Sequence, residues 1–141
     1  MSDAAALRRV RVVAAVVRDG ELLLLTQRPP VGPLGLQWEF PGGKIEPGET
    51  PEHALVREVH EELGVEASTH EVLAVHAHDY DHLSVEITFI RATLASFEFK
   101  PSVAVHAWRW LAPHDVPLSE VLEADRDFLR AMGARDEGEP R

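Results

Sequence analysis

The sequence predicts an α/β fold, an α/β/α sandwich with a mixed β-sheet between helices. Three observations predict it: apolar, β-branched runs typical of strands, a helical pattern over residues 50–64 that interrupts them, and a second helical pattern near the end. The order strands, helix, strands, helix favours a mixed sheet covered on both faces. A chain of 141 residues is expected to form one domain, with a core over 8–132 and a polar, frayed tail over 134–141.

The first predicted element is a β-hairpin. Val10–Arg18 and Glu21–Arg28 are rich in apolar and β-branched residues, and Asp19-Gly20 joins them. Asp-Gly between two such runs is a strong hairpin signal, because both residues tolerate the backbone of a tight turn. We therefore expect the two strands to pair antiparallel.

A loop, a short apolar segment and a turn follow the hairpin. Pro29–Gly35 is rich in proline and glycine, which is typical of a loop. Trp38–Phe40 is apolar but too short for a long strand. Pro41–Gly43 is predicted to be a turn.

The next element is a helix with recognisable ends. Thr50 is a candidate N-cap, Pro51 suits the first helical position, and Gly64 suits the position after the last. The apolar stripe at i, i+4 and i+8 consists of Leu55, Val59 and Leu63. We expect this stripe to pack on the sheet.

Three further strands and a second helix complete the chain. The strands are predicted at Glu71–Ala77, Ser84–Leu94 and Ala104–Leu111. The second helix is predicted over Ser119–Met132, where apolar residues recur at helical spacing.

An acidic face is the most informative feature of the first helix. Glu58, Glu61 and Glu62 stand at i, i+3 and i+4, so their carboxylates share one face. Like charges at this spacing destabilise a helix by about 0.2–0.5 kcal/mol per pair, and a bound divalent cation reverses that sign. Mg²⁺ takes oxygen ligands and is commonly held by carboxylates together with substrate phosphates. The alternative is a merely solvated acidic face.

Composition narrows the class of function. A net charge of −10 disfavours nucleic-acid binding, which needs a basic surface, but it is compatible with a nucleotide whose phosphates are received by metal ions. The absence of cysteine excludes disulfides and thiolate metal sites. No apolar run is long enough to span a membrane, and no signal peptide is evident, so a cytoplasmic location is expected. Nothing indicates an obligate protein partner.

The segment around the acidic face resembles the signature of the Nudix family, G-x5-E-x7-R-E-U-x-E-E-x-G-U, where U is apolar. All nine defined positions agree, namely Gly43, Glu49, Arg57, Glu58, Val59, Glu61, Glu62, Gly64 and Val65. The flanking run Trp38–Lys44 is similar to that of the MutT-like branch, and so are Arg28, Trp110 and Asp125. The resemblance implies the Nudix fold over about residues 8–132.

The resemblance also implies a reaction. Members of the MutT-like branch hydrolyse a nucleoside triphosphate to the monophosphate and pyrophosphate with Mg²⁺, and Mn²⁺ can substitute. The expected substrates are oxidised purine triphosphates such as 8-oxo-dGTP, or CTP and modified dCTP. The alternatives are a dinucleoside polyphosphate, ADP-ribose or a nucleotide sugar, or a binding module that senses nucleotides without hydrolysing them.

The catalytic roles follow from motif position. The implied metal ligands are the Gly42 carbonyl, Glu58, Glu61 and Glu62. Glu58 is also the leading candidate for the general base, and Lys44 is expected to contact a phosphate. Arg57 and Glu49 are expected to pair and orient the loop against the helix. The alternative for Arg57 is a simple i, i+4 partner of Glu61.

Substrate choice is expected to lie outside the signature. The candidate contacts are Arg28, Trp38, Phe40, His78, Tyr80 and Asp125. The resemblance to the MutT-like branch implies that Asp125 faces the base, where its carboxylate can accept a hydrogen bond from an exocyclic amine, although such an acid is more often solvated. Trp38 and Phe40 offer a flat apolar surface for a base but are more often core. The histidines at 76, 78 and 82 line or flank the cleft, with a zinc site as the weaker alternative.

The chain departs from the family pattern at one point. Related enzymes often carry a further acid about six residues before the late tryptophan, and counting back from Trp110 gives Ala104. No acid lies between Lys100 and Leu111, and His106 is the nearest substitute. The accessory metal ligand and the identity of the base are therefore open.

Overall fold

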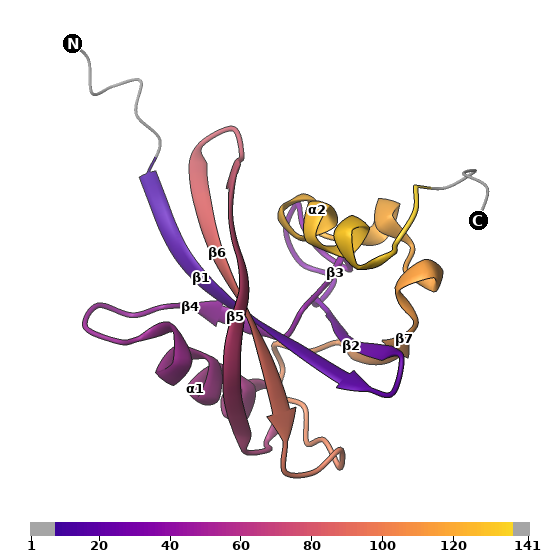
Figure 1. Ribbon diagram of the computed structural model, residues 1–141. Helices are drawn as coiled ribbons and strands as arrows, with labels where there is room; N and C mark the ends of the chain where they lie inside the picture. Colours follow the sequence, from indigo (N-terminus) through magenta and orange to yellow (C-terminus); the bar gives the residue numbers. More distant parts are fainter. Residues whose placement is uncertain (1–7, 137–141) are drawn as a thin grey trace.

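The computed structural model describes residues 8–136, and a mixed sheet of seven strands forms its centre (Figure 1). The strand order is β3-β2-β1-β6-β5, with β4 pairing with β1 and β7 pairing with β2. The elements are β1 (Arg8–Asp19), β2 (Leu22–Gln27), β3 (Trp38–Glu39), β4 (Gly42–Lys44), α1 (Pro51–Leu63), β5 (Ala67–Asp79), β6 (Leu83–Leu94), β7 (Ala107–Leu111), the short 3-10 helices η2 (Pro113–Asp115) and η3 (Leu118–Glu120), and α2 (Glu123–Met132).

The two α-helices cover opposite faces of the sheet, which confirms the predicted sandwich. Alternate residues of β1 point to opposite sides. Val13 and Ala15 belong to the core that contains the apolar stripe of α1, whereas Ala14 and Val16 belong to the core that contains Phe128 of α2. Figure 1 shows α1 and α2 on either side of the long central strands.

The sheet is mixed because β1 lies parallel to β6 and antiparallel to its other partners. The parallel register runs from Arg8 opposite Leu83 to Val17 opposite Ala92. Parallel strands need a long crossover connection. Here that connection includes β4, α1 and β5, so the parallel pairing fixes α1 across one face.

The ends of α1 match the prediction. Thr50 is the N-cap, and its side chain accepts a hydrogen bond from the His53 amide at 3.1 Å. Pro51 occupies the first turn, and Gly64 closes the helix with φ +70°. The buried face includes Leu55, Val59 and Leu63, each fully buried, and such a side chain stabilises the fold by about 1.5–3 kcal/mol.

The hairpin is confirmed, with its turn one residue later than predicted. β1 ends at Asp19 and β2 begins at Leu22, so Gly20 and Glu21 form the two-residue loop. Gly20 has φ +61°, as the favoured hairpin turns require at their first central position.

The predicted turn over Pro41–Gly43 is wrong, because Gly42–Lys44 is strand β4 and pairs with Val12–Ala14 of β1. A Cβ at Gly42, where φ is +152°, would collide with the Val13 carbonyl oxygen. Glycine thus permits a close backbone approach rather than a turn.

The second helix is shorter than predicted. Its first part is the separate turn η3, and the chain is then extended at Val121, which bridges to Trp38. The Leu122 amide donates to the Trp38 carbonyl at 2.9 Å. This contact with a distant strand interrupts the helical pattern, and α2 begins at Glu123.

Other boundaries differ. β5 runs over Ala67–Asp79 and is longer at both ends than the predicted Glu71–Ala77. β7 begins at Ala107 rather than Ala104, because a turn closed by Val105 N and Ser102 O at 3.1 Å precedes it. Ala134 was expected in the polar tail but is 5% exposed, and its amide donates to Leu129 O. The rest of the predicted tail from 137 to 141 lies outside the described residues. Among the helices that the structure describes, none has the length and apolar character needed to cross a membrane.

Candidate active site

The acidic face of α1 lies against β4. Glu58 approaches Gly43 so closely that a Cβ there would collide with its carboxylate. The Glu62 carboxylate accepts a hydrogen bond from the Gly42 amide at 3.3 Å. α1 buries its apolar stripe under the sheet, so its acids are presented at the edge where β4 runs. The structure thereby brings together Gly42, Glu58 and Glu62 as the sequence predicted.

Arg57 joins the helix to the loop that precedes it. Its Nε donates to Glu49 Oε2 at 2.7 Å, and its Nη2 donates to Glu49 Oε1 at 2.9 Å and to the Lys44 carbonyl at 3.0 Å. The contact with Glu61 is longer, at 3.3 Å. Arg57 is therefore more than an i, i+4 partner of Glu61: its shortest bonds form a bidentate pair with Glu49.

This ion pair sets the charge of the loop. The hydrogen bond from Arg57, followed by that from the Glu46 amide at 3.0 Å, lowers the pKa of Glu49 to about 2. In turn, the hydrogen bond to Glu49 raises the pKa of Arg57 above its ordinary range. Both groups stay charged across the working pH range, so the connection between loop and helix does not depend on pH in that range.

The neighbouring acids Glu58 and Glu62 have raised rather than lowered pKa values. Burial, followed by the charges of Glu39 and Glu58, raises the pKa of Glu62 to about 8. Burial also raises the pKa of Glu58, and the charge of Arg57 only partly offsets it. These carboxylates lack sufficient positive charge around them, so their site favours a cation.

The donor set fits a hard divalent ion. Glu58, Glu61 and Glu62 offer carboxylate oxygens, Gly42 offers a carbonyl, and Mg²⁺ prefers oxygen ligands. Within residues 8–136, no three acidic or histidine side chains are already gathered as a metal site. Glu61 is directed to Arg57 and Glu62 to the Gly42 amide, so both would turn to hold an ion.

The prediction missed Glu39. Burial raises its pKa to about 7, while Arg28, at 3.4 Å, lowers it in part. Its charge raises the pKa values of both Glu62 and Asp125, so it lies between the signature acids and α2. The available signal was the position of an acid between two large apolar residues, Trp38 and Phe40.

Asp125 is buried rather than solvated, with 4% of its surface exposed. Its Oδ2 accepts from the Phe40 amide at 3.3 Å. Burial, followed by the charge of Glu39, raises its pKa to about 8. The carboxyl group is therefore mostly protonated at neutral pH, so it can donate one hydrogen bond and accept others.

The two aromatic candidates beside Glu39 belong to the core. Trp38 is 6% exposed and Phe40 is 3% exposed. Phe40 packs edge-on against Phe89 and Phe128, with ring centroids 5.8 and 5.7 Å apart. A base contact by either ring, or by the half-exposed Arg28, stays a prediction.

His78 and Tyr80 lie at the β5–β6 hairpin and contact the start of α2. Tyr80 Oη accepts from the Ala124 amide at 3.2 Å. His78 Nε2 lies 3.3 Å from Glu123 Oε2 without a hydrogen bond of good geometry. The zinc alternative finds no support in the part of the chain that the structure describes, since no histidine and acid group gathers there.

The remaining candidates, Lys44 and the segment from Ala104 to His106, include exposed residues. Lys44 has an exposed side chain, and no carboxylate among residues 8–136 pairs with it, so it is free to meet a phosphate. Ala104 and His106 are exposed, and Val105 is buried in the core with α1. A role for His106 stays a prediction. The further acid that the structure brings near Glu62 is Glu39.

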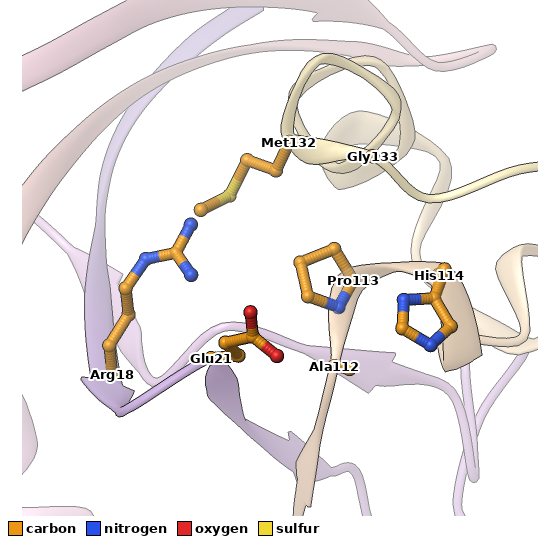
Figure 2. A pocket seen from close by; sticks show the side chains of 7 residues that line it. All are labelled: Arg18, Glu21, Ala112, Pro113, His114, Met132 and Gly133. Carbon is orange, nitrogen blue, oxygen red and sulfur yellow. The ribbon is translucent and has the colours of Figure 1, made fainter.

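Two surface cavities lie away from these acids. One, of about 250 Å³, is lined by Arg18, Glu21, His114 and the end of α2 (Figure 2). The other, of about 630 Å³, lies between α2 and the far ends of β1 and β6. None of the predicted site residues lines either cavity.

Comparison with known proteins identifies the family of the chain. The NUDIX domain model matches residues 7–132. The chain is 39% identical over 130 residues to a CTP pyrophosphohydrolase of Escherichia coli, covering 85% of this chain and 96% of that protein. It is 37% identical over 87 residues to an 8-oxo-dGTP diphosphatase of Proteus vulgaris, covering 61% and 78% of the two chains.

Solved structures share the fold. The solution structure of the E. coli ORF135 protein has a TM-score of 0.73 at 32% identity and covers 89% of both chains. The MutT protein of Methanosarcina mazei has a TM-score of 0.80 at 20% identity, covering 90% of this chain and 94% of that one, which shows the fold alone. The chain therefore belongs to the Nudix family and is a MutT-like hydrolase that acts on nucleotides.

Proposed function

We propose that the protein hydrolyses a nucleoside triphosphate to the monophosphate and pyrophosphate with Mg²⁺, with Mn²⁺ as a possible substitute. The observation that carries this proposal is the contact between the acidic face of α1 and β4, where under-compensated carboxylates meet the Gly42 backbone. Water attacks a phosphorus atom, the phosphoanhydride bond breaks, and pyrophosphate leaves. The substrate carries about four negative charges, so this attack requires charge neutralisation.

The residues have separate roles in this proposal. Glu58, Glu61, Glu62 and the Gly42 carbonyl would hold the metal, which would supply neutralisation of phosphate charge and activation of the attacking water. Glu58 is the leading general base, and Lys44 contacts a phosphate. The bidentate Arg57–Glu49 pair holds the loop and β4 in position.

The proposed substrates are CTP and modified dCTP, or an oxidised purine triphosphate such as 8-oxo-dGTP. The names of the two relatives above support both choices. Asp125 supports a base edge with a donor and an acceptor side by side, because a protonated carboxyl both donates and accepts. Cytosine offers such an edge, with its exocyclic amine as the donor.

A substrate panel tests the reaction. Canonical, oxidised and methylated triphosphates, ADP-ribose, nucleotide sugars and a dinucleoside polyphosphate are compared with Mg²⁺ and with a chelator. We expect metal-dependent pyrophosphate release, lost in Glu61→Gln and Glu62→Gln and kept in the matched control Glu52→Gln. A preference for ADP-ribose, a nucleotide sugar or a dinucleoside polyphosphate overturns the triphosphate proposal.

A second variant tests base recognition. Asp125→Ala should change discrimination between bases by about 1–3 kcal/mol, the range of one good base contact. The measurement is the ratio of kcat/KM values across the panel. Unchanged ratios would remove Asp125 from the base site while leaving the reaction itself in place.

A further inference from the structure

The start of α2 lacks a cap of its own. Its N-cap residue is Leu122, whose side chain makes no capping hydrogen bond. The first amides of a helix have no intrahelical acceptor, and a side-chain oxygen normally accepts from the second or third of them. In α2 the second is the Ala124 amide.

Tyr80 provides the missing acceptor from the β5–β6 hairpin. Its hydroxyl oxygen accepts from Ala124 N at 3.2 Å, across 44 positions of the chain. The His78 ring packs against the Tyr80 ring with centroids 4.6 Å apart, and His78 Nε2 lies 3.3 Å from Glu123 Oε2. The hairpin therefore contacts two consecutive residues of the first turn of α2.

The next residue along that turn is Asp125. On its other side, Asp125 Oδ2 accepts from the Phe40 amide at 3.3 Å. The first turn of α2 is thus held between the Tyr80 hydroxyl and the backbone of Phe40. Figure 1 shows the β5–β6 hairpin extending past α2 at the end of the sheet where β1 begins.

We propose that Tyr80 is a positioning residue for base discrimination and acts through Asp125 rather than by touching the base. Its hydroxyl fixes the Ala124 amide and with it the turn that carries the Asp125 carboxyl. This inference rests on the proposed role of Asp125. It replaces the expectation that Tyr80 contacts the substrate directly.

Tyr80→Phe tests the proposal because it removes the acceptor and keeps the ring. We expect base discrimination, measured as kcat/KM ratios, to fall by about 3- to 10-fold, the factor that corresponds to a lost capping hydrogen bond. A role in stability alone would lower kcat/KM equally for every substrate and leave the ratios unchanged. Asp81→Asn, an exposed residue of the same hairpin loop, is the matched control and should leave the ratios unchanged.

A double-mutant cycle with Asp125→Ala separates the two roles. If Tyr80 acts through Asp125, Tyr80→Phe has no further effect on discrimination once Asp125 is removed. Additive effects would overturn the proposal in favour of a direct base contact. If Asp125→Ala leaves base discrimination unchanged, the proposed base site fails. If Asp125→Ala changes discrimination but Tyr80→Phe leaves it unchanged, this inference alone fails.

Hydrogen exchange of the wild-type protein gives a readout that needs no variant. The Ala124 amide is expected to exchange slowly because Tyr80 accepts its hydrogen bond. Exchange of Ala124 as fast as that of a solvated first-turn amide would overturn the proposal, even if Tyr80→Phe did not fold.

Discussion

The two α-helices of this protein begin in different ways. α1 begins at a local cap, where Thr50 accepts from the His53 amide three residues later. α2 begins at Glu123 after the N-cap Leu122, whose side chain makes no capping hydrogen bond. Its start is bonded instead to Tyr80 in the β5–β6 loop and to the Trp38 carbonyl of β3. α1 carries the acids proposed for the reaction, and α2 carries the proposed base contact, Asp125.

The difference separates chemistry from specificity. The residues that position Glu58 and Glu62 lie within about twenty positions of them, so the arrangement of these acids depends on one segment of the chain. The residues proposed to position Asp125 are Tyr80 and Phe40, which lie 45 and 85 positions away along the chain. If Asp125 contacts the base as proposed, substrate choice can change through the sheet and hairpin without any change in the signature.

The largest expected effect is at Glu58. Glu58→Gln should lower kcat by about 10²-fold or more, because it removes a metal ligand or the general base. Steady-state rates at saturating Mg²⁺ measure this, with Glu52→Gln on the same helix as the control. Activity near that of the wild type would remove Glu58 from the catalytic set.

The loop connection is the next test. Arg57→Lys keeps the charge but cannot form the bidentate pair with Glu49. We expect kcat to fall by about 10- to 100-fold through misplacement of β4 and the acids. A lysine variant with full activity would mean that charge alone suffices and that the bidentate geometry is unimportant.

On the side of α2, the buried Asp125 should make stability depend on pH. Its pKa is about 8 in the folded protein and near its ordinary value of 3.8 when unfolded. The folded state therefore binds the proton more tightly, and this contribution to stability is present below pH 4 and is lost as pH rises to 8.

Asp125→Asn removes this dependence and keeps an acceptor for the Phe40 amide. The variant should gain stability relative to the wild type as pH rises from 4 to 8. Chemical denaturation at several pH values measures the difference in unfolding free energy. A difference that stays constant with pH would contradict a buried, protonated Asp125.

The smallest expected effect compares the caps. Thr50→Ala should cost about 1 kcal/mol of stability, as a lost N-cap does. It should leave the kcat/KM ratios between bases unchanged, in contrast to Tyr80→Phe. Equal changes of these ratios in both variants would mean that the local and the remote cap do not differ in function.

The sequence predicted what local patterns determine. Both ends of α1, its buried stripe and its acidic face depend on residues close along the chain, and the structure has them as expected. The predicted start of α2 was wrong because the Leu122 amide donates to the Trp38 carbonyl. Helical periodicity along the sequence gives no sign of this distant contact.

The same limit explains β4 and Glu39. Gly42 and Gly43 are typical of a turn, and only the close approach of Val13 and Glu58 shows why a strand of glycines is needed there. Glu39 stands out through its partly buried position between two other acids, and this position comes from the fold.

The parallel pairing of β1 with β6 has a consequence for how the protein is made. Apolar residues of both strands, among them Val13 and Ile90, form the surface on which α1 packs. During synthesis β1 emerges first, but its parallel neighbour, ending at Leu94, is available only after two thirds of the chain. Pairing across such a sequence distance is slow compared with local contacts. We therefore expect α1 to dock on the sheet late, only after β6 has been synthesised and has paired with β1.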